Sequence, residues 1–278
     1  LEDADLVRRL RKRAALRRIP EPIVTSPRRY LEEGRWTGWL RNTAIICLYL
    51  AGASPGRLAR FHRPRRPNPR RILLVFGKAP IPGKVKTRLA AEVGADYAAE
   101  VYRALGRKVV DQLRGGAFRM VICFDPPEAR QAMEEWLGRN GVEYRAQAQG
   151  DLGARLKKAI RDAFLEADRV VVVGTDAPGV DRELVEEAFR RLQGKDVVLG
   201  PSKDGGYYLL GLSEPAPELF EGIPWSTEGV LQATRERATL LGLREHTLAT
   251  LADVDTLDDL RALRLELAPS PLPSSLLK

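Results

Sequence analysis

The chain has 278 residues, of which 44% are hydrophobic and 30% are charged, and its formal net charge is +9. This composition is typical of a globular protein and excludes a wholly disordered chain. With only two cysteines and two histidines, a zinc site built from Cys and His ligands is excluded as well. Residues 1–71 hold 18 Lys and Arg against 6 Asp and Glu, so the basic charge belongs to this quarter and the remainder is mildly acidic.

The first 62 residues combine a basic helical pattern with a short apolar run. Residues 5–18 have helical spacing and a heavily basic face, whereas residues 44–51 fall far short of the ~20 apolar residues that span a bilayer. We therefore expect an interfacial or partner-packed helix. Residues 5–66 would make weak contact with an anionic membrane surface, and no aromatic motif accompanies them that would indicate specific nucleic-acid binding.

Residues 63–71, rich in Pro and Arg, form a predicted linker, because they suit neither a helix nor a central strand. Beyond them, residues 72–267 alternate between apolar runs and amphipathic patterns, and residues 268–278 form a Pro/Ser-rich tail that we expect to be flexible. Strands are expected at 72–77, 118–124, 169–174, 196–200 and 206–212, and helices at 95–113, 127–138, 152–167, 181–193, 227–241 and 256–267. This order predicts an α/β domain with a mostly parallel sheet covered by helices on both faces.

The first expected strand runs directly into the segment GKAPIPGKVKTRL, residues 77–89. Open α/β sheets bind ligands beyond the carboxyl ends of their strands, where glycines admit backbone amides and cations neutralise phosphates. A Walker loop is excluded because five residues separate Gly77 from Gly83 and Val85 follows Lys84. A solvated basic turn is the alternative interpretation. The predicted nucleotide-binding residues of this loop are Lys78, Gly83, Lys84, Lys86, Thr87 and Arg88.

Carboxylates follow two more of the expected strands. Asp176, in the segment GTDAP, stands at the tip of a buried valine strand and is well placed to hold Mg²⁺ or Mn²⁺ against a diphosphate. The alternative role, capping the next helix, suits Asp181 better because it lies closer to the helix start. We assign Thr175 to the nucleotide site with it. In the segment ADVDTLDDL, Asp253 and Asp255 precede a helix and are candidates for a second metal ligand.

Three further segments supply candidates for the rest of the site. Asp204, Gly205 and Gly206 predict a hairpin turn, which with Tyr207 could equally line an acceptor pocket. In GDLGAR, residues 150–155, Asp151 is a plausible N-cap and Arg155 could reach a phosphate. Trp225 is a further acceptor candidate, followed by Ser226 and Thr227, either of which is expected to cap the next helix.

Taken in order, the motifs KAPIPGKVKTRL, GDLGAR, GTDAP, GPSKDGGYYLLGL, PWST and DVDTLDDL resemble those of the transferase 1 family associated with radical-SAM/selenodomain proteins. That family belongs to the nucleotide-diphospho-sugar transferase superfamily, has the Rossmann-like GT-A fold and has been linked to arsenosugar-type glycosyl transfer. The resemblance covers about residues 72–266. It implies a bacterial, cytoplasmic transferase with a nucleotide-sugar donor, a small-molecule acceptor and a divalent metal, Mg²⁺ or Mn²⁺.

More distantly, the first loop and the late VDT motif are similar to nucleotidyltransferases such as phospholactate guanylyltransferase and sugar-activating cytidylyltransferases. That similarity implies that Asp176 and Asp255 share the metal. The sequence departs from the usual GT-A DxD motif, since Gly174-Thr175-Asp176 carries one carboxylate where two are expected. Residues 1–62 resemble instead the carboxyl end of a family 2 glycosyltransferase, whose active-site pair would be Glu2 and Asp3. We expect a truncated fusion in which residues 1–62 have no catalytic activity.

Three functions are compatible with these residues. In a glycosyltransferase, Asp204 or Asp253 would activate the acceptor hydroxyl. A nucleotidyltransferase would use the same loop and carboxylates to attack an NTP and release pyrophosphate. The third hypothesis is a non-catalytic nucleotide-binding or scaffolding module whose basic N-terminus engages a membrane or nucleic acid. If an Asp176→Asn variant kept its turnover of every tested donor, the site assignment would be wrong.

Overall fold

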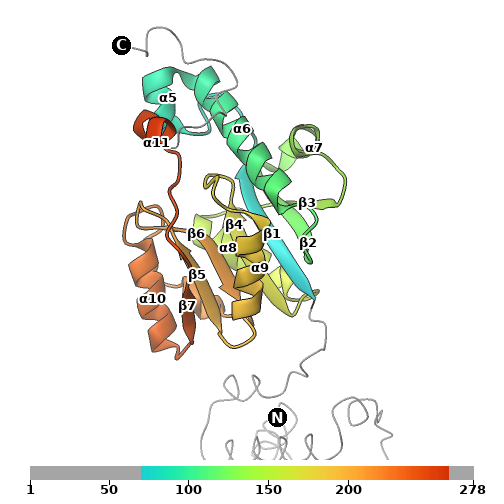
Figure 1. Ribbon diagram of the computed structural model, residues 1–278, viewed down its shortest axis with the longest axis vertical. Helices are drawn as coiled ribbons and strands as arrows, with labels where there is room; N and C mark the ends of the chain where they lie inside the picture. Colours follow the sequence, from blue (N-terminus) through green and yellow to red (C-terminus); the bar gives the residue numbers. More distant parts are fainter. Residues whose placement is uncertain (1–69, 263–278) are drawn as a thin grey trace, which may run out of the picture. The chain divides into compact units, whose positions relative to one another are not determined.

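The computed structural model describes residues 70–262 (Figure 1). By its internal contacts the chain divides into two units, Leu1–Asn68 and Pro69–Lys278, and the described residues belong to the second. The expectations for residues 1–62, for most of the linker and for the tail lie outside the described residues. Among residues 70–262, no helix is both long and apolar enough to cross a membrane.

The domain is built on one seven-stranded sheet with the order β3-β2-β1-β4-β6-β5-β7. The strands are β1 Arg71–Lys78, β2 Arg119–Asp125, β3 Val142–Ala146, β4 Arg169–Gly174, β5 Val197–Pro201, β6 Tyr207–Leu212 and β7 Glu245–Thr247. Only β6 runs antiparallel to its neighbours β4 and β5, and every other pairing is parallel. The predicted mostly parallel sheet is confirmed.

Helices cover both faces of this sheet (Figure 1). They are α5 Thr87–Val93, α6 Ala95–Leu113, α7 Arg130–Leu137, α8 Leu152–Ala163, α9 Arg182–Arg191, α10 Val230–Leu240 and α11 Leu257–Ala262, with 3₁₀ turns η1 Pro127–Ala129 and η2 Pro217–Phe220. Alternate residues of β1 enter different apolar clusters, because successive side chains of a strand point to opposite faces. Leu73 packs with α6, α7 and α9, whereas Leu74 packs with α8 and α10.

A third apolar cluster joins the carboxyl-terminal end of the domain to the first loop. Leu89 of α5, Leu105 of α6 and Leu257 of α11 are all buried in it. Figure 1 shows α5 and α11 beside the first turns of α6, beyond the carboxyl end of β1. This packing carries the late VDT motif to the loop that follows the first strand, although the two are far apart in sequence.

Most expected elements match the structure closely, and α6 has the predicted bounds. The predicted N-caps are also confirmed: Asp151 accepts a hydrogen bond from Ala154 N at 2.8 Å and Asp181 accepts one from Leu184 N at 2.9 Å. The sequence did not predict α5, β3 or β7. β7 is only three residues long. α5 buries only Leu89 and begins within the basic motif, so it has no clear amphipathic pattern.

Two helix predictions need correction. The helix expected at 227–241 begins at Val230, because residues 227–229 form a turn that follows the left-handed Ser226, whose φ is 65°. Its N-cap is Gly229, which forms no side-chain cap, and the Thr227 hydroxyl donates instead to Pro224 O at 2.7 Å. The helix expected at 152–167 ends at Ala163.

Candidate active site at the carboxyl ends of the parallel strands

The carboxyl ends of β2, β1 and β4 lie at the same edge of the sheet because these strands are parallel neighbours. Lys78 ends β1, Asp125 ends β2 and Gly174 ends β4. The chain leaves β1 for β2 on one side and reaches β4 on the other, so the order of strands reverses here. Such switch points are where open α/β sheets bind their ligands.

The centre of this site is an ion-pair cluster around Lys86. Its Nζ lies 2.7 Å from Oδ1 of Asp176 and 2.7 Å from Oδ1 of Asp255. The side chain of Lys86 is only 4% exposed, whereas the two carboxylates are 48% and 39% exposed. Burial alone would lower the pKa of Lys86, but the two carboxylates offset it, so its pKa lies above the ordinary value.

The backbone at Lys86 is unusual as well. It has φ 47° and ψ 48° at the start of α5, and only Lys86 and Ser226 have positive φ among the non-glycine residues from 70 to 262. A left-handed backbone at such a residue costs about 1–2 kcal/mol and persists only where the surroundings fix it. Both residues belong to segments in which the sequence predicted ligand contacts.

Asp253 lies close to the same cluster. Burial and the nearby charges of Asp204 and Asp176 raise its pKa to about 7. Asp255 itself is held by the next helix turn, where its backbone N–H donates to Asp259 at 3.1 Å. The structure therefore brings together four of the predicted carboxylates, which come from three separate segments of the chain.

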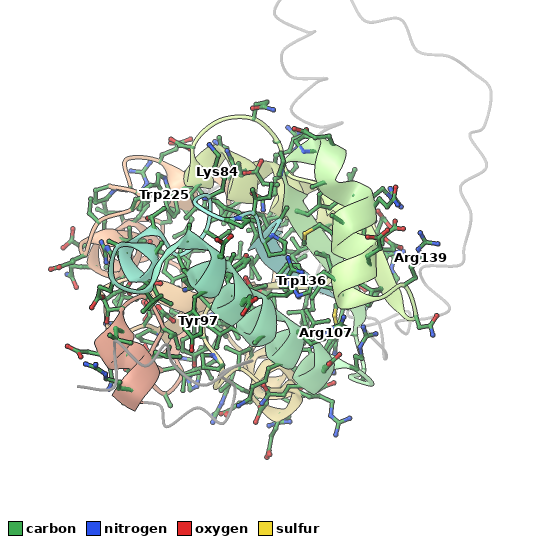
Figure 2. The ribbon with its side chains drawn as sticks, turned by 90° about the horizontal axis from the view of Figure 1, so that it is seen from above. Lys84, Tyr97, Arg107, Trp136, Arg139 and Trp225 are labelled. Atoms are coloured by element: carbon green, nitrogen blue, oxygen red, sulfur yellow. The ribbon has the colours of Figure 1, made fainter. Side chains whose placement is uncertain are left out.

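The remaining cations of the first loop face outward. Lys78, Lys84 and Arg88 are exposed, and none of them forms an ion pair with another described residue. Gly83 has φ 75° and open space around it. Thr87 is also exposed, and Lys84 is one of the residues labelled in Figure 2. We call Lys78, Lys84 and Arg88, the exposed cations in the same loop as the buried Lys86, the cationic rim.

A buried network lies beneath this rim. The Tyr102 hydroxyl accepts a hydrogen bond from Lys78 N at 2.8 Å and lies 3.0 Å from Oγ1 of Thr175. Burial raises the pKa of Tyr102 to about 12, so the phenol stays protonated. Thr175 is only 1% exposed. Its side chain contacts Tyr102, and sequence reasoning did not find Tyr102 because it lies on the buried face of α6.

The hairpin turn between β5 and β6 has its own hydrogen bonds. Oδ1 of Asp204 accepts from the Ser202 hydroxyl and from Gly206 N, the latter at 3.0 Å. Gly205 has φ 86°, and a Cβ there would lie 2.2 Å from Glu228 O. The turn thus packs closely against the segment that precedes α10. The hydroxyl of Tyr207 is buried next to Thr234.

Trp225 packs against Gly153 of α8, and Arg155 belongs to the same helix. Trp225 stacks on Phe220 with ring centroids 6.3 Å apart, and its Nε1 lies 2.2 Å from where a Cβ on Gly153 would be. Arg155 forms an ion pair with Asp125 at 3.0 Å and also donates to Gly150 O. Asp125 was missed, although it follows an apolar strand as Asp176 does, and this was the signal that could have found it.

A divalent metal would depend on Asp176 and Asp255. Within the described part of the chain, no three His, Cys, Asp or Glu side chains form a group that could hold a metal ion. Two carboxylate oxygens do converge on a single cationic point, the position of Lys86 Nζ. Two protein carboxylates, with substrate phosphates completing the shell, are a usual donor set for Mg²⁺ in nucleotide sites.

The comparison with known proteins gives the family. A crystal structure from Desulfovibrio desulfuricans G20, provisionally described as a nucleotide-diphospho-sugar transferase, is 39% identical, with a TM-score of 0.66. The alignment covers 69% of this chain and 85% of that chain. The chain belongs to the nucleotide-diphospho-sugar transferase superfamily. It is therefore a transferase, and its sheet is the Rossmann-like sheet predicted for this superfamily.

The other matches cover a shorter stretch of the chain or have a much lower sequence identity. A bacterial family described as "Uncharacterized protein conserved in bacteria (DUF2064)" matches residues 109–227. No curated protein matches the sequence significantly. A CMP:2-keto-3-deoxy-manno-octonic acid synthetase in complex with CTP is 16% identical, covers 70% of this chain and 97% of that chain, and has a TM-score of 0.43. Rv0371C of Mycobacterium tuberculosis H37Rv in complex with manganese is 16% identical, covers 72% of this chain and 98% of that chain, and has a TM-score of 0.45.

Proposed function

We propose that this superfamily member is a bacterial, cytoplasmic glycosyltransferase of the transferase 1 type, which transfers a sugar from a nucleotide-diphospho-sugar to a small-molecule acceptor. The observation that carries the proposal is the convergence of Asp176 and Asp255 on one cation-binding point, in the same site as the exposed cations of the first loop. The Desulfovibrio relative supports it, because its description names a nucleotide-diphospho-sugar as the substrate class.

In this proposal the cationic rim binds the diphosphate of the donor. Lys78, Lys84 and Arg88 are exposed and form no ion pair with residues 70–262, so binding a phosphate would break no ion pair within that part of the chain. Gly83 and Thr87 border the same loop and would place backbone and hydroxyl donors near the phosphates. Arg155 is already held by Asp125, and its contact with the nucleotide would be made from that fixed position.

Asp176 and Asp255 would hold Mg²⁺ or Mn²⁺. When bound, this ion would neutralise the charge that develops on the leaving nucleoside diphosphate. The ligands of this ion would be the two Oδ1 atoms that now contact Lys86 Nζ, because both already lie next to the same positive charge. The chain itself supplies the second source of neutralisation through the cations of the rim.

Asp253 is the stronger candidate for accepting the proton of the acceptor. In the transfer, the acceptor oxygen forms a bond to the anomeric carbon, the bond from that carbon to the diphosphate breaks, and the acceptor proton passes to the carboxylate. Asp253 lies among the other carboxylates of the site, whereas Oδ1 of Asp204 is held by Ser202 and Gly206 within its own turn. Asp204 remains the second candidate through its other oxygen.

The acceptor would lie against the β5–β6 turn. Gly205 and Gly206 form the turn, Trp225 presents an indole from the neighbouring segment, and Tyr207 supports the turn through a ring packed in the second apolar cluster. The half-buried indole of Trp225 suits the apolar face of a sugar or of another acceptor group.

A second candidate function is nucleotidyl transfer. Three exposed cations in one loop are more than a diphosphate requires and would suit the triphosphate of an NTP. In that reaction the attack is on the α-phosphate, and pyrophosphate leaves. The binding residues are the same in both proposals, so the products separate them.

The test is turnover of a panel of nucleotide sugars and NTPs with Mn²⁺ present and absent. Release of a nucleoside diphosphate from a nucleotide sugar, dependent on Mn²⁺ and lost in Asp253→Asn, is the expected result. Pyrophosphate release from an NTP would replace the first proposal by the second. Turnover of neither class would refute both.

A further inference from the structure

The position of Lys86 distinguishes it from every other cation of the first loop. Lys84 and Arg88 are exposed, whereas the Lys86 side chain is 4% exposed and touches both proposed metal ligands. A single ammonium group within hydrogen-bonding distance of two carboxylates neutralises half of their combined charge. In the structure as it stands, the point between Asp176 and Asp255 therefore already holds a cation.

We propose that Lys86 acts as a resident counter-ion that competes with the divalent metal for the Asp176–Asp255 pair. This inference rests on the metal site of the proposed function and adds a control on its occupancy. The ammonium and a metal ion cannot both lie between the same two oxygens, since like charges at that separation repel strongly. The metal is bound only when the ammonium moves away from the pair.

The geometry supports exchange rather than joint binding. Both Nζ–Oδ1 distances are 2.7 Å, so the ammonium lies against both oxygens, and its contact with Asp255 is a hydrogen bond whereas its contact with Asp176 is an ion pair only. No third carboxylate, histidine or cysteine of the described residues completes a separate metal group. Without the ammonium, the two carboxylates would be a partly buried pair of like charges, which binds a divalent cation strongly.

The consequence is that the nucleotide-free protein has low metal affinity. A donor that arrives with its metal brings phosphates, which offer the displaced ammonium another anionic partner. Lys86 would then contact a phosphate only in the loaded site. Lys86, which the sequence predicted as a phosphate ligand, would thus also be the counter-ion of the two carboxylates before the donor binds.

The experiment compares Mn²⁺ binding to the full chain, the Lys86→Met variant and the Lys84→Met variant, by calorimetry in nucleotide-free buffer at constant pH and ionic strength. The two variants lose the same charge from the same loop, but only Lys86 contacts the carboxylates. We expect Lys86→Met to bind Mn²⁺ at least about tenfold more tightly than the unaltered chain and Lys84→Met to stay within about twofold of it. A Lys86→Met affinity no greater than that of the unaltered chain overturns the proposal.

A double variant locates the ion. Adding Asp176→Asn to Lys86→Met should abolish the gain in affinity, and a gain that survives would overturn the proposal because the ion would lie elsewhere. If Lys86→Met does not fold without metal, its thermal unfolding is followed with Mn²⁺ added. A cooperative transition restored by Mn²⁺ supports the proposal, and a chain that stays unfolded contradicts it.

Failure of the proposed function has a different signature. If no nucleotide sugar or NTP is turned over, the glycosyltransferase and nucleotidyltransferase proposals are refuted, whatever the affinities for Mn²⁺ are. If turnover is found but Lys86→Met binds Mn²⁺ no more tightly, only the counter-ion role is refuted.

Discussion

The two halves of the sheet use polar residues in opposite ways. At the ends of β1 and β4, Lys78, Lys84 and Arg88 are exposed without an ion pair to any residue between 70 and 262, and the carboxylates contact one buried lysine. At the turn between β5 and β6, Asp204 is satisfied by Ser202 and Gly206. The parallel half is thus arranged to receive charge from a ligand, whereas the antiparallel half supplies a fixed shape.

The largest expected effect is a loss of activity when a carboxylate at the ends of β1 and β4 is removed. Asp176→Asn removes one of the two carboxylates that converge on the cation point, and turnover of the donor should fall by about 10²–10³ in kcat/KM. Asp258→Asn is the matched control, because that side chain on α11 is 89% exposed, and its kcat/KM should not change. Equal activity of the two variants would remove Asp176 from the site.

Substitutions in the β5–β6 turn should change the free energy of unfolding. In Gly205→Ala the new Cβ would lie 2.2 Å from Glu228 O at a φ of 86°, and we expect a loss of about 2–4 kcal/mol in the free energy of unfolding. Gly222→Ala has a similar φ of 73° but open space, so it should lose only about 1 kcal/mol. Urea unfolding measures both. Equal losses would show that the close packing of the turn contributes nothing.

The network beneath the rim should have an intermediate effect. Tyr102→Phe removes the acceptor for Lys78 N and the partner of Thr175, and should destabilise the protein by about 1–3 kcal/mol in urea unfolding. Tyr97→Phe is its control on the same helix, since the buried Tyr97 hydroxyl has no hydrogen-bond partner among the described residues. That change should be neutral or slightly stabilising, and a similar loss in both variants would contradict the assigned contacts.

The smallest effect is expected for single rim cations. Lys84→Ala should weaken nucleotide binding about three- to tenfold at low salt, and the difference should shrink as ionic strength rises because the charge is exposed. Arg139→Ala is the control. Arg139 pairs with Glu134 at 2.8 Å and lies far from Lys84 in Figure 2, so nucleotide affinity measured by calorimetry should not change. A salt-independent effect of Lys84→Ala would contradict a purely electrostatic contact.

Local signals were sufficient for much of the fold. The valine run of β4 and the amphipathic pattern of α6 are strong because each element buries many residues, and the caps Asp151 and Asp181 form within their own turn. The signals failed where little is buried, as in β7, or where a residue adopts a left-handed backbone, as at Ser226. Such elements depend on contacts from distant parts of the chain.

The sequence by itself determined which residues follow each strand, and therefore that cations and carboxylates would meet at one edge of a parallel sheet. Only the tertiary structure decided which cation meets which carboxylate. Lys84 and Lys86 are two residues apart and chemically identical, yet one is exposed and the other lies buried between Asp176 and Asp255. The physical reason is that the packing of α5 against α6 and α11 carries Asp255 to Lys86 across 169 residues of sequence, a contact that no local pattern records.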